Sequence, residues 1–348
     1  MTNRSLGLPR GLGRGLLAGT AAAAMLASAA FADTRAALVP GGPHPYFAAW
    51  EQAGADAAAE FGLAGADYRV PQQWELSQQN QLLESLLTQG YNAFLIFPGD
   101  PVGTNSIVGE LTGEGATVIS LAGCLQEPSD DAFCLGTDTG NSAYLGTKEL
   151  IEAMGGQGRI AHFTGFLVDP NTQLRIDAVQ QAADEAGDGV EVIQVIADID
   201  APEPAEERIN AFLAAEAENV DGIITTAWVP AVVAANALRR MGDQRIVMVG
   251  IDHDEVVLQA IRDGYVHGTM LQNPYGQGYI GSFAADRLRS GCTVNADAPF
   301  GSTALTSRFI DSGTAFVGAD EVETYIAAMQ AVTAELMADF EDTYLDCP

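Results

Sequence analysis

Residues 75–97, ELSQQNQLLESLLTQGYNAFLIF, contain the pattern that recurs through most of this chain. In the first half, leucines at 76, 82, 83, 86 and 87 lie at helical spacing while Gln and Glu face away, which predicts an amphipathic helix over 75–88. In the second half, AFLIF at 93–97 is a short apolar run typical of a buried strand. A helix followed by a buried strand is the repeating unit of α/β proteins with a parallel sheet.

The same alternation continues on both sides of this stretch from residue 35 onward, without long linkers or low-complexity tracts. It forms two series, over 33–137 and 138–272, with a break in rhythm at Gly136-Thr137-Asp138. Two such series predict an α/β fold of two lobes, each a doubly wound parallel sheet covered by helices. The expected strands are residues 36–39, 67–70, 93–97, 117–121, 159–163, 190–196, 222–226, 246–251 and 268–272.

The residues after 272 contain too few elements for a third domain, so we expect them to complete the two lobes. A helical run at 278–289 and an extended piece at 307–310 are the clearest elements there. Over 322–340, apolar residues recur at helical spacing from Tyr325 to Phe340, which predicts a closing amphipathic helix. The expected domains are a first lobe of 33–137 plus 273–299, a second lobe of 138–272 plus 300–318, and a C-terminal helix and tail over 319–348.

The first 32 residues have the pattern of a signal peptide. Arg4, Arg10 and Arg14 precede an almost uncharged run over 16–31, which ends in the A-x-A sequence of residues 30–32. The run is too short for a comfortable bilayer span, and the A-x-A sequence predicts cleavage after it. No Cys stands directly after the cleavage point, so we expect no lipid anchor on the new N-terminus. We expect the mature protein in the periplasm. The alternative, a buried Ala-rich helix, would leave three arginines without partners.

The chain is strongly acidic, with 46 Asp and Glu residues against 16 Lys and Arg and a net charge of −30. Cleavage after residue 32 removes three arginines and no acid, which makes the net charge −33. A field of this sign repels phosphate backbones and anionic headgroups, so we expect no nucleic acid or membrane surface as a partner. Lys148 is the only lysine and lies in no phosphate-binding GxxxxGK[ST] loop, which leaves little scope for Schiff-base chemistry.

Four cysteines remain after cleavage, in a compartment that permits disulfides. Three pairings are possible from the sequence alone. We expect Cys124–Cys134, which would close a polar loop, and Cys292–Cys347, which would hold the C-terminal tail. A catalytic cysteine or a zinc site is the alternative, but there is no C-x-x-C motif and the four histidines lie far from every Cys in the sequence.

Motifs of enzymes and of metal sites are mostly absent, including GxSxG, HExxH and the EF-hand loop. GQGYIG at 276–281 matches a dinucleotide fingerprint, but no acidic residue ends a strand about 20 residues further on. Asp169, Asn171 and Gln173 alternate as calcium ligands do, but the sixth position of that loop is Leu, which favours Asn171 or Thr172 as a helix N-cap. We therefore expect no catalytic residue, no metal and no cofactor.

Polar and aromatic residues follow several expected strands, at the edge where open parallel sheets bind ligands. Planar Asp, Asn, Gln and Arg side chains bridge neighbouring hydroxyl groups, and aromatic rings stack on the apolar face of a sugar ring. This combination predicts a site for a small hydroxyl-rich molecule. The candidate ligand-binding residues are His44, Tyr46, Phe47, Asn171, Arg175, Trp228, Asp252 and Gln272.

Each candidate also has an ordinary structural interpretation. Tyr46 and Phe47 also fit the apolar start of a helix, and Arg175 fits a charge on a helix surface. Asp252 fits a helix N-cap and Trp228 fits a core residue. The prediction of a binding site therefore rests on the set and not on any one member. For Asp138, we expect a structural cap where the chain crosses between lobes.

The order of six short motifs resembles the type I periplasmic sugar-binding proteins, in their ribose-binding branch. The resemblance covers residues 33–318 and implies two lobes, joined by three hinge strands, that close on a sugar and deliver it to an ABC importer without catalysing a reaction. The motifs are PYF at 45–47 with Gly54, GYNAFLIF at 90–97, GTD at 136–138, LR at 174–175, VGID at 249–252 and MLQNP at 270–274.

The resemblance also implies roles for single residues. Tyr46 and Phe47 match the family's paired stacking aromatics, and Arg175 matches its hydroxyl-clamping arginine. Asp252 matches a carboxylate that accepts from two hydroxyls, and Gln272 matches a glutamine at a hinge crossing. Other positions depart from the family: an expected Asp-Arg pair reads Ala122-Gly123, an expected Asn reads Ala227-Trp228, and His44 replaces another Asn. These departures predict a ligand other than ribose bound in the usual way.

The expected function is thus capture of a monosaccharide, polyol or sugar acid, by a monomer that serves an ABC permease. One alternative is that the same liganded protein signals to a chemoreceptor or a sensor kinase. Another is an extracytoplasmic enzyme on the same scaffold, which the absence of an evident nucleophile with its base disfavours.

Overall fold

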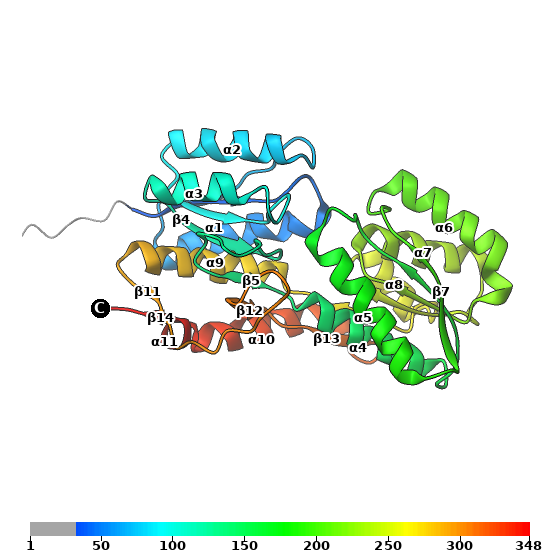
Figure 1. The fold of residues 1–348 in the computed structure, drawn as a ribbon. Coiled ribbons are helices and arrows are strands. Elements are labelled where there is room, and N and C mark those ends of the chain that lie inside the picture. The colour runs from blue at the N-terminus through cyan, green and yellow to red at the C-terminus, as the bar shows by residue number, and fades with distance from the viewer. Residues whose placement is uncertain (1–32) are drawn as a thin grey trace, which may run out of the picture. The chain divides into compact units, whose positions relative to one another are not determined.

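The computed structural model describes residues 33–348, and the expected signal peptide with its cleavage site lies outside these described residues. Two six-stranded sheets form the centres of two α/β lobes (Figure 1). The first sheet has the strand order β12-β5-β4-β3-β1-β2, and the second has the order β13-β10-β9-β8-β6-β7. These findings confirm the predicted fold class.

All six strands of the first sheet are parallel, and in the second sheet only β13 runs antiparallel, against β10. The first sheet contains β1 (Arg35–Val39), β2 (Gly65–Tyr68), β3 (Ala93–Ile96), β4 (Thr117–Leu121), β5 (Cys134–Gly136) and β12 (Phe309–Asp311). The second contains β6 (Gly158–Phe163), β7 (Val190–Ile196), β8 (Gly222–Thr225), β9 (Val247–Ile251), β10 (Gly268–Leu271) and β13 (Ala315–Gly318). All nine expected strands are present.

Helices cover both faces of each sheet, because successive strand residues point to opposite faces and both faces are apolar. In β3, for example, Phe94 and Ile96 join the core under α2 and α3, whereas Ala93 and Leu95 join the core under α1 and α9. The helices of the first lobe are α1 (Ala49–Phe61), α2 (Leu76–Thr88), α3 (Asn105–Gly113) and α9 (Pro274–Arg289). Those of the second are α4 (Thr139–Ala153), α5 (Pro170–Ala186), α6 (Pro202–Glu216), α7 (Trp228–Met241) and α8 (Glu255–Arg262).

Side-chain caps fix where several helices begin. Asp138 Oδ1 accepts a hydrogen bond from the backbone N–H of Asn141 at 2.9 Å, so Asp138 caps α4 as expected. The cap of α5 is Asp169, which accepts from the N–H of Asn171 at 2.8 Å. The expectation that Asn171 or Thr172 caps this helix is therefore wrong, because the helix begins at Pro170 and both residues lie inside it.

The chain crosses between the lobes three times between sheet elements, as the three-strand hinge requires. The crossings follow β5 at residues 137–138, β10 at 272–273 and β12 at 312–314. They are tied together by Ser312, whose carbonyl accepts from Asn273 Nδ2 at 3.2 Å and whose hydroxyl lies 3.3 Å from the hydroxyl of Thr137, within hydrogen-bond distance. One expected boundary is corrected: residues 300–311 do not belong to the second lobe, because β12 pairs with β5 of the first sheet.

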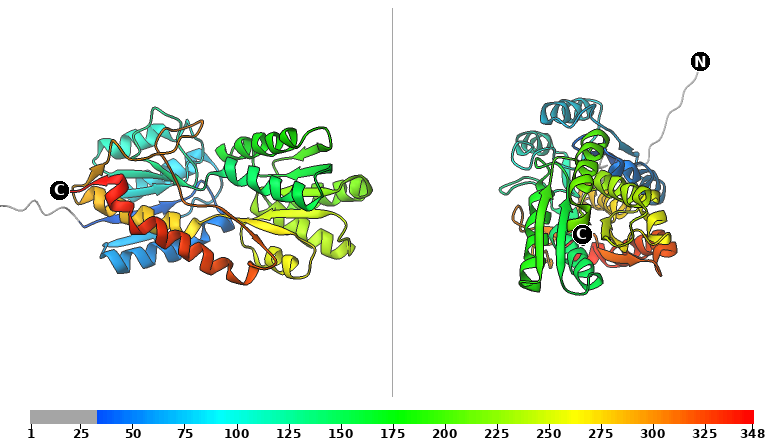
Figure 2. Two further views of the ribbon diagram at one scale, coloured as in Figure 1. Left: turned by 90° about the horizontal axis from the view of Figure 1, so that it is seen from below. Right: turned by 90° about the vertical axis from the view of Figure 1, so that its right-hand side faces the viewer.

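The C-terminal segment makes a further connection between the lobes. After β13, a short 3-10 helix (Val322–Thr324) leads into α10 (Tyr325–Ala338) and α11 (Phe340–Tyr344). Tyr325 and Met329 lie in the core of the second lobe, whereas Phe340 lies in the core of the first. Helix α10 packs against α9 and appears in red in Figure 2. The expected closing helix thus exists and spans both lobes.

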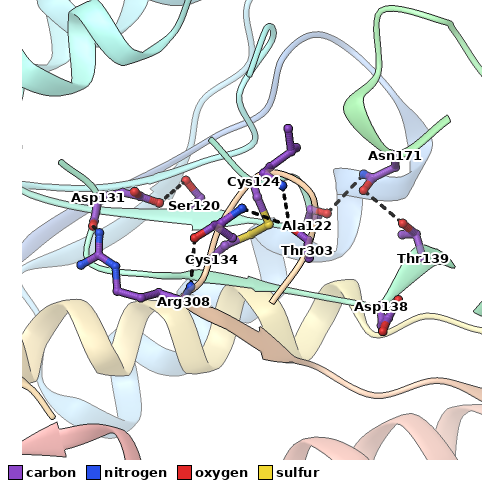
Figure 3. The surroundings of a disulfide bond; sticks show 12 residues. Ser120, Ala122, Cys124, Asp131, Cys134, Asp138, Thr139, Asn171, Thr303 and Arg308 are labelled. Atoms are coloured by element: carbon purple, nitrogen blue, oxygen red, sulfur yellow. Dashed lines mark hydrogen bonds between the residues drawn. A yellow bond between two sulfur atoms is a disulfide. The ribbon is translucent and has the colours of Figure 1, made fainter. Parts of the chain in front are cut away.

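Both expected disulfides form. Cys124 and Cys134 join the β4–β5 loop to β5, with their Cα atoms 5.4 Å apart (Figure 3). Cys292 and Cys347 join the end of α9 to the C-terminal tail, next to a two-stranded sheet of β11 (Thr293–Val294) and β14 (Leu345–Asp346). Among residues 33–348, no helix has the length and apolar character needed to cross a membrane.

Candidate functional site

One cavity brings together all eight residues that the sequence predicted for ligand binding. The empty space that these residues surround, including its opening to solvent, is about 510 Å³. It is enclosed by residues from both lobes and from the hinge. The lining residues are His44, Tyr46, Phe47, Trp74, Phe97, Ala122, Phe166, Asp169, Asn171, Arg175, Asp200, Ala227, Trp228, Asp252 and Gln272.

The first lobe supplies an aromatic wall. Tyr46 and Phe47 lie on a short 3-10 helix, Pro45–Ala48, that His44 caps by accepting from the N–H of Tyr46 at 3.2 Å. The Phe47 ring packs against Trp50 and Phe97, with centroid distances of 4.8 and 5.2 Å. Because Phe47 and Trp50 are almost fully buried, this wall is continuous with the core of the lobe.

The second lobe and the hinge supply a polar wall. Asp169, Asn171 and Arg175 follow β6, Asp200 follows β7, Asp252 follows β9, and Gln272 follows β10. The carboxyl ends of neighbouring parallel strands lie along one edge of a sheet, so these side chains converge although they are far apart in the sequence. The cavity therefore combines an aromatic wall from the first lobe with a wall from the second lobe that is rich in hydrogen-bonding groups and also includes Phe166 and Trp228.

Arg175 is a buried charge, only 7% exposed, and so it is not the surface helix residue of the alternative interpretation. Its Nη1 lies 3.7 Å from Asp169 Oδ2, and its Nε has no hydrogen-bond partner within residues 33–348. Leaving a buried donor unpaired is costly, about 1–3 kcal/mol. A ligand oxygen in the cavity would remove that cost.

Asp252 is held in an unusual backbone conformation at the polar wall. Its φ is +66°, in the left-handed region, and its side chain is 2% exposed. Gln272 Nε2 donates to Asp252 Oδ1 at 2.7 Å. The N-cap of α8 is Asp254, so the capping interpretation of Asp252 is wrong. Burial raises the pKa of Asp252 to about 6, although Gln272 and Arg175 oppose this shift.

His44 and Asp200 meet across the cavity from opposite lobes. His44 Nε2 lies 3.2 Å from Asp200 Oδ2, without the angles of a hydrogen bond, so the contact is an ion pair when His44 is protonated. Burial lowers the pKa of His44, but the carboxylates of Asp200, Asp252 and Asp169 outweigh burial, and the pKa is raised above its ordinary value.

The polar atoms of two aromatic residues point away from ligand contacts. The Tyr46 hydroxyl donates to Gln277 Oε1 at 2.9 Å, which ties the aromatic wall to α9. Trp228 Nε1 donates to Asp254 Oδ2 at 3.1 Å, and the indole packs against the core cluster of the first lobe. Their rings, rather than their polar atoms, thus line the cavity, and Trp228 is not a core residue of its own lobe.

Three contacts join the two lobes around the cavity. Besides the His44–Asp200 pair, Asn171 Nδ2 donates to the carbonyl of Ala122 at 3.3 Å, beside the Cys124–Cys134 disulfide (Figure 3). The rings of Trp74 and Phe166 also approach across the opening, with their centroids 6.3 Å apart. A ligand in this cavity is therefore contacted from both lobes at once.

A family model described as a periplasmic binding protein domain matches residues 36–291 of this chain. The chain belongs to this family. Among curated proteins, it is 25% identical over 240 residues to a xylitol-binding protein of Mycolicibacterium smegmatis, covering 68% of this chain and 67% of that protein. It is 24% identical over 263 residues to a D-apiose import binding protein of Actinobacillus succinogenes, covering 74% and 83%.

Solved structures support the fold of this periplasmic binding protein. An ABC transporter solute-binding protein from Burkholderia graminis, in complex with D-arabinose, superposes with a TM-score of 0.75 at 22% identity. The match covers 85% of this chain and 98% of that one. At this identity the likeness establishes two-lobed architecture and leaves the ligand open.

Sequence reasoning missed several lining residues of this periplasmic binding protein. Asp200 lies in the loop after β7, Phe97 directly follows β3, and Trp74 lies in the loop after β2. The rule that polar and aromatic groups after strands form the site would have found all three if applied to every strand. Ala122 contributes its backbone carbonyl, for which the sequence holds no signal.

The motifs of other site classes have structural explanations. GQGYIG lies inside α9, whose Gly278 and Gly281 face Ala53 and Leu121 at distances that leave little room for a side chain. It therefore serves close helix packing rather than a phosphate loop. Gln173 donates to Asp177 on the outer face of α5, away from Asp169. Within residues 33–348, no group of three or more His, Cys, Asp or Glu residues is arranged to hold a metal ion.

Proposed function

We propose that this protein is a periplasmic solute-binding protein that captures a small polyhydroxylated molecule for an ABC importer. The observation that carries the proposal is the cavity between the lobes, which offers both aromatic rings and Asp, Asn, Gln and Arg side chains to a ligand. Sugars and polyols have such a two-sided character, with C–H faces and hydroxyl edges. A monosaccharide, a polyol and a sugar acid all fit this description.

In the proposed mechanism, the ligand enters between open lobes, and closure around the hinge buries it. Tyr46, Phe47 and Trp228 cover its apolar faces, while Arg175, Asp252 and Gln272 bond its hydroxyls. His44 and Asn171 complete the enclosure by contacts to the opposite lobe. The closed form then presents both lobe surfaces together to the permease. The protein acts as a monomer and leaves its ligand chemically unchanged.

The relatives support this substrate class. The names of two curated relatives give xylitol and D-apiose as their ligands, and the Burkholderia graminis structure holds D-arabinose. All three molecules are small, neutral and rich in hydroxyl groups. The family and the signal peptide expected at residues 1–32 both support a periplasmic location.

A ligand panel tests the proposal. Purified protein lacking residues 1–32 is screened by thermal shift against pentoses, hexoses, pentitols, hexitols, cyclitols and sugar acids, and hits are measured by calorimetry. We expect one narrow chemical class to stabilise the protein, since a ligand at 100 times its Kd adds about 2.7 kcal/mol. A double variant, Arg175→Ala with Asp252→Ala, is the control and should lose the shift. No response to any member of the panel would overturn the proposal.

A further inference from the structure

We infer that Asp169 and Asp200 are charge-specificity residues, which make the site accept neutral polyhydroxylated ligands and reject their carboxylated counterparts. This inference rests on the proposed function and narrows it. Arg175 is a group that would normally invite a carboxylate, because guanidinium pairs with carboxylate in a bidentate way. The surroundings of Arg175 and of His44 remove that invitation.

Each positive group at the cavity already faces a carboxylate of the protein. Arg175 Nη1 lies 3.7 Å from Asp169 Oδ2, and His44 Nε2 lies 3.2 Å from Asp200 Oδ2. These pairs are largely shielded from water, with side-chain exposures of 9% and 18% for the first and 11% and 14% for the second. Charges that are paired inside a protein offer little net attraction to a further anion.

The carboxylates of the two acidic residues are also held in place by backbone N–H groups of other residues. Asp169 Oδ1 accepts from the N–H of Asn171 at 2.8 Å, and Asp200 Oδ1 accepts from the N–H of Val229 at 3.0 Å. Each carboxylate therefore has one oxygen bound by the fold and a second oxygen turned toward a cation of the cavity. Neither residue is free to swing away when a negatively charged ligand enters.

Asp252 adds a third carboxylate without a third cation. It lines the same cavity and is bonded by the neutral amide of Gln272. The cavity therefore holds three carboxylates against one guanidinium and one imidazole. The pKa of His44 is raised in spite of burial, because its three carboxylate neighbours favour the protonated ring. This direction is the one expected from an excess of negative charge. Like charges brought together at a binding site are strongly disfavoured.

The polar groups that remain suit hydroxyls. Arg175 Nε is a buried donor with no partner in the described part of the chain, and one oxygen from a hydroxyl can satisfy it. A hydroxyl also donates, which suits the carboxylates, whereas a carboxylate ligand only accepts. Hydroxyl groups thus satisfy both kinds of group in this cavity, whereas the carboxylate group of an ionised acid satisfies only the donors.

Carbon-matched open-chain pairs test the inference by calorimetry at pH 7: xylitol with xylonate, and D-arabinitol with D-arabinonate. We expect the acid of each binding pair to be weaker by at least about a hundredfold, because the like-charge contacts cost several kcal/mol. Asp200→Asn and Asp169→Asn should each narrow that ratio by improving the binding of the acid. Asp177→Asn, on the exposed side of α5, is the matched control and should leave the ratio unchanged.

The outcomes separate the inference from the proposed function. If an acid binds within tenfold of its neutral partner, or if the ratio is the same in both asparagine variants as in Asp177→Asn, charge selection by Asp169 and Asp200 is wrong while the binding function stands. If no member of the wider sugar panel binds, the function fails and the inference falls with it. Should one asparagine variant not fold, the other still tests whether its carboxylate sets the ratio, and the unmodified protein still tests whether the acid is rejected.

Discussion

The two walls of the cavity have opposite effects on the stability of the fold. The aromatic wall of the first lobe continues its hydrophobic core, so every ring that faces the ligand also stabilises the fold. The polar wall of the second lobe buries charged and amide groups whose partners are incomplete without a ligand. Because buried polar groups cost free energy unless paired, the same cavity contains one wall that supports folding and one that opposes it. Substitutions in the two walls should therefore differ in sign as well as in size.

The largest effect is expected from Phe47→Ala in the aromatic wall. Loss of a buried Phe that touches Trp50 and Phe97 should lower the free energy of unfolding by about 3–5 kcal/mol. Urea denaturation of ligand-free protein measures this. Phe166→Ala is the control, since Phe166 lines the same cavity from the second lobe but is only half-buried. Equal losses for both variants would contradict the assignment of the Phe47 ring to the hydrophobic core of the first lobe.

Asp252→Asn should have the opposite effect on the fold. The pKa of Asp252 is raised to about 6, above the unfolded value of about 3.9, so the folded protein holds this proton more tightly. Its contribution to the free energy of unfolding therefore falls as pH rises from about 4 to about 6 and stays low above that range. Asparagine removes this ionisation, and the ligand-free variant should be more stable at pH 7 by roughly 2 kcal/mol.

The same variant should bind ligand more weakly, because it loses a charge-assisted acceptor. Thermal unfolding between pH 4 and pH 8, with Asp177→Asn as the control, separates this residue from the other carboxylates. If the stability difference between Asp252→Asn and the unmodified protein is the same at pH 4.5 and pH 7, burial does not raise the pKa of Asp252.

Much of the fold was predictable because its signals are local. Strands such as β3 and β8 are buried on both faces and read as continuous apolar runs, and helices such as α2 show one apolar stripe. By contrast, β5 and β12 have three residues each, too few for any period, and their pairing joins segments more than 170 residues apart. The misplaced boundary at 300–311 follows from that long-range pairing.

The candidate site divides in the same way. Asp252, Gln272 and Arg175 were predictable from position, because the ends of parallel strands converge. Their partners were not: that His44 meets Asp200 depends on how far the lobes close, and that Ala122 offers a carbonyl depends on backbone geometry. Sequence thus identified the groups that line the cavity better than the contacts between them.

Arg175→Ala sharpens the comparison on the binding side. Loss of the guanidinium should lower affinity by about 1–3 kcal/mol, which calorimetry measures with any ligand found in the panel. Arg159→Ala is the matched control, because Arg159 is 46% exposed and pairs only loosely with Glu191. Unchanged affinity in Arg175→Ala would remove this residue from the proposed site while leaving the two-lobed fold intact.

The smallest effect is expected from Asn171→Ala, because the amide of this polar-wall residue contributes one neutral hydrogen bond between the lobes. Asn171 Nδ2 reaches the Ala122 carbonyl of the first lobe at 3.3 Å, while its Oδ1 accepts from Thr139 Oγ1 at 3.2 Å within its own lobe. A neutral hydrogen bond of this length is worth about 0.5–1.5 kcal/mol, so affinity should fall by roughly tenfold or less. Thr139→Val removes the bond within the lobe and keeps the bond across it, so its affinity should stay nearer that of the unmodified protein. If the two variants lose affinity equally, the contact between lobes contributes nothing beyond the local packing of Asn171, and closure must depend on the His44–Asp200 pair and the aromatic contacts instead.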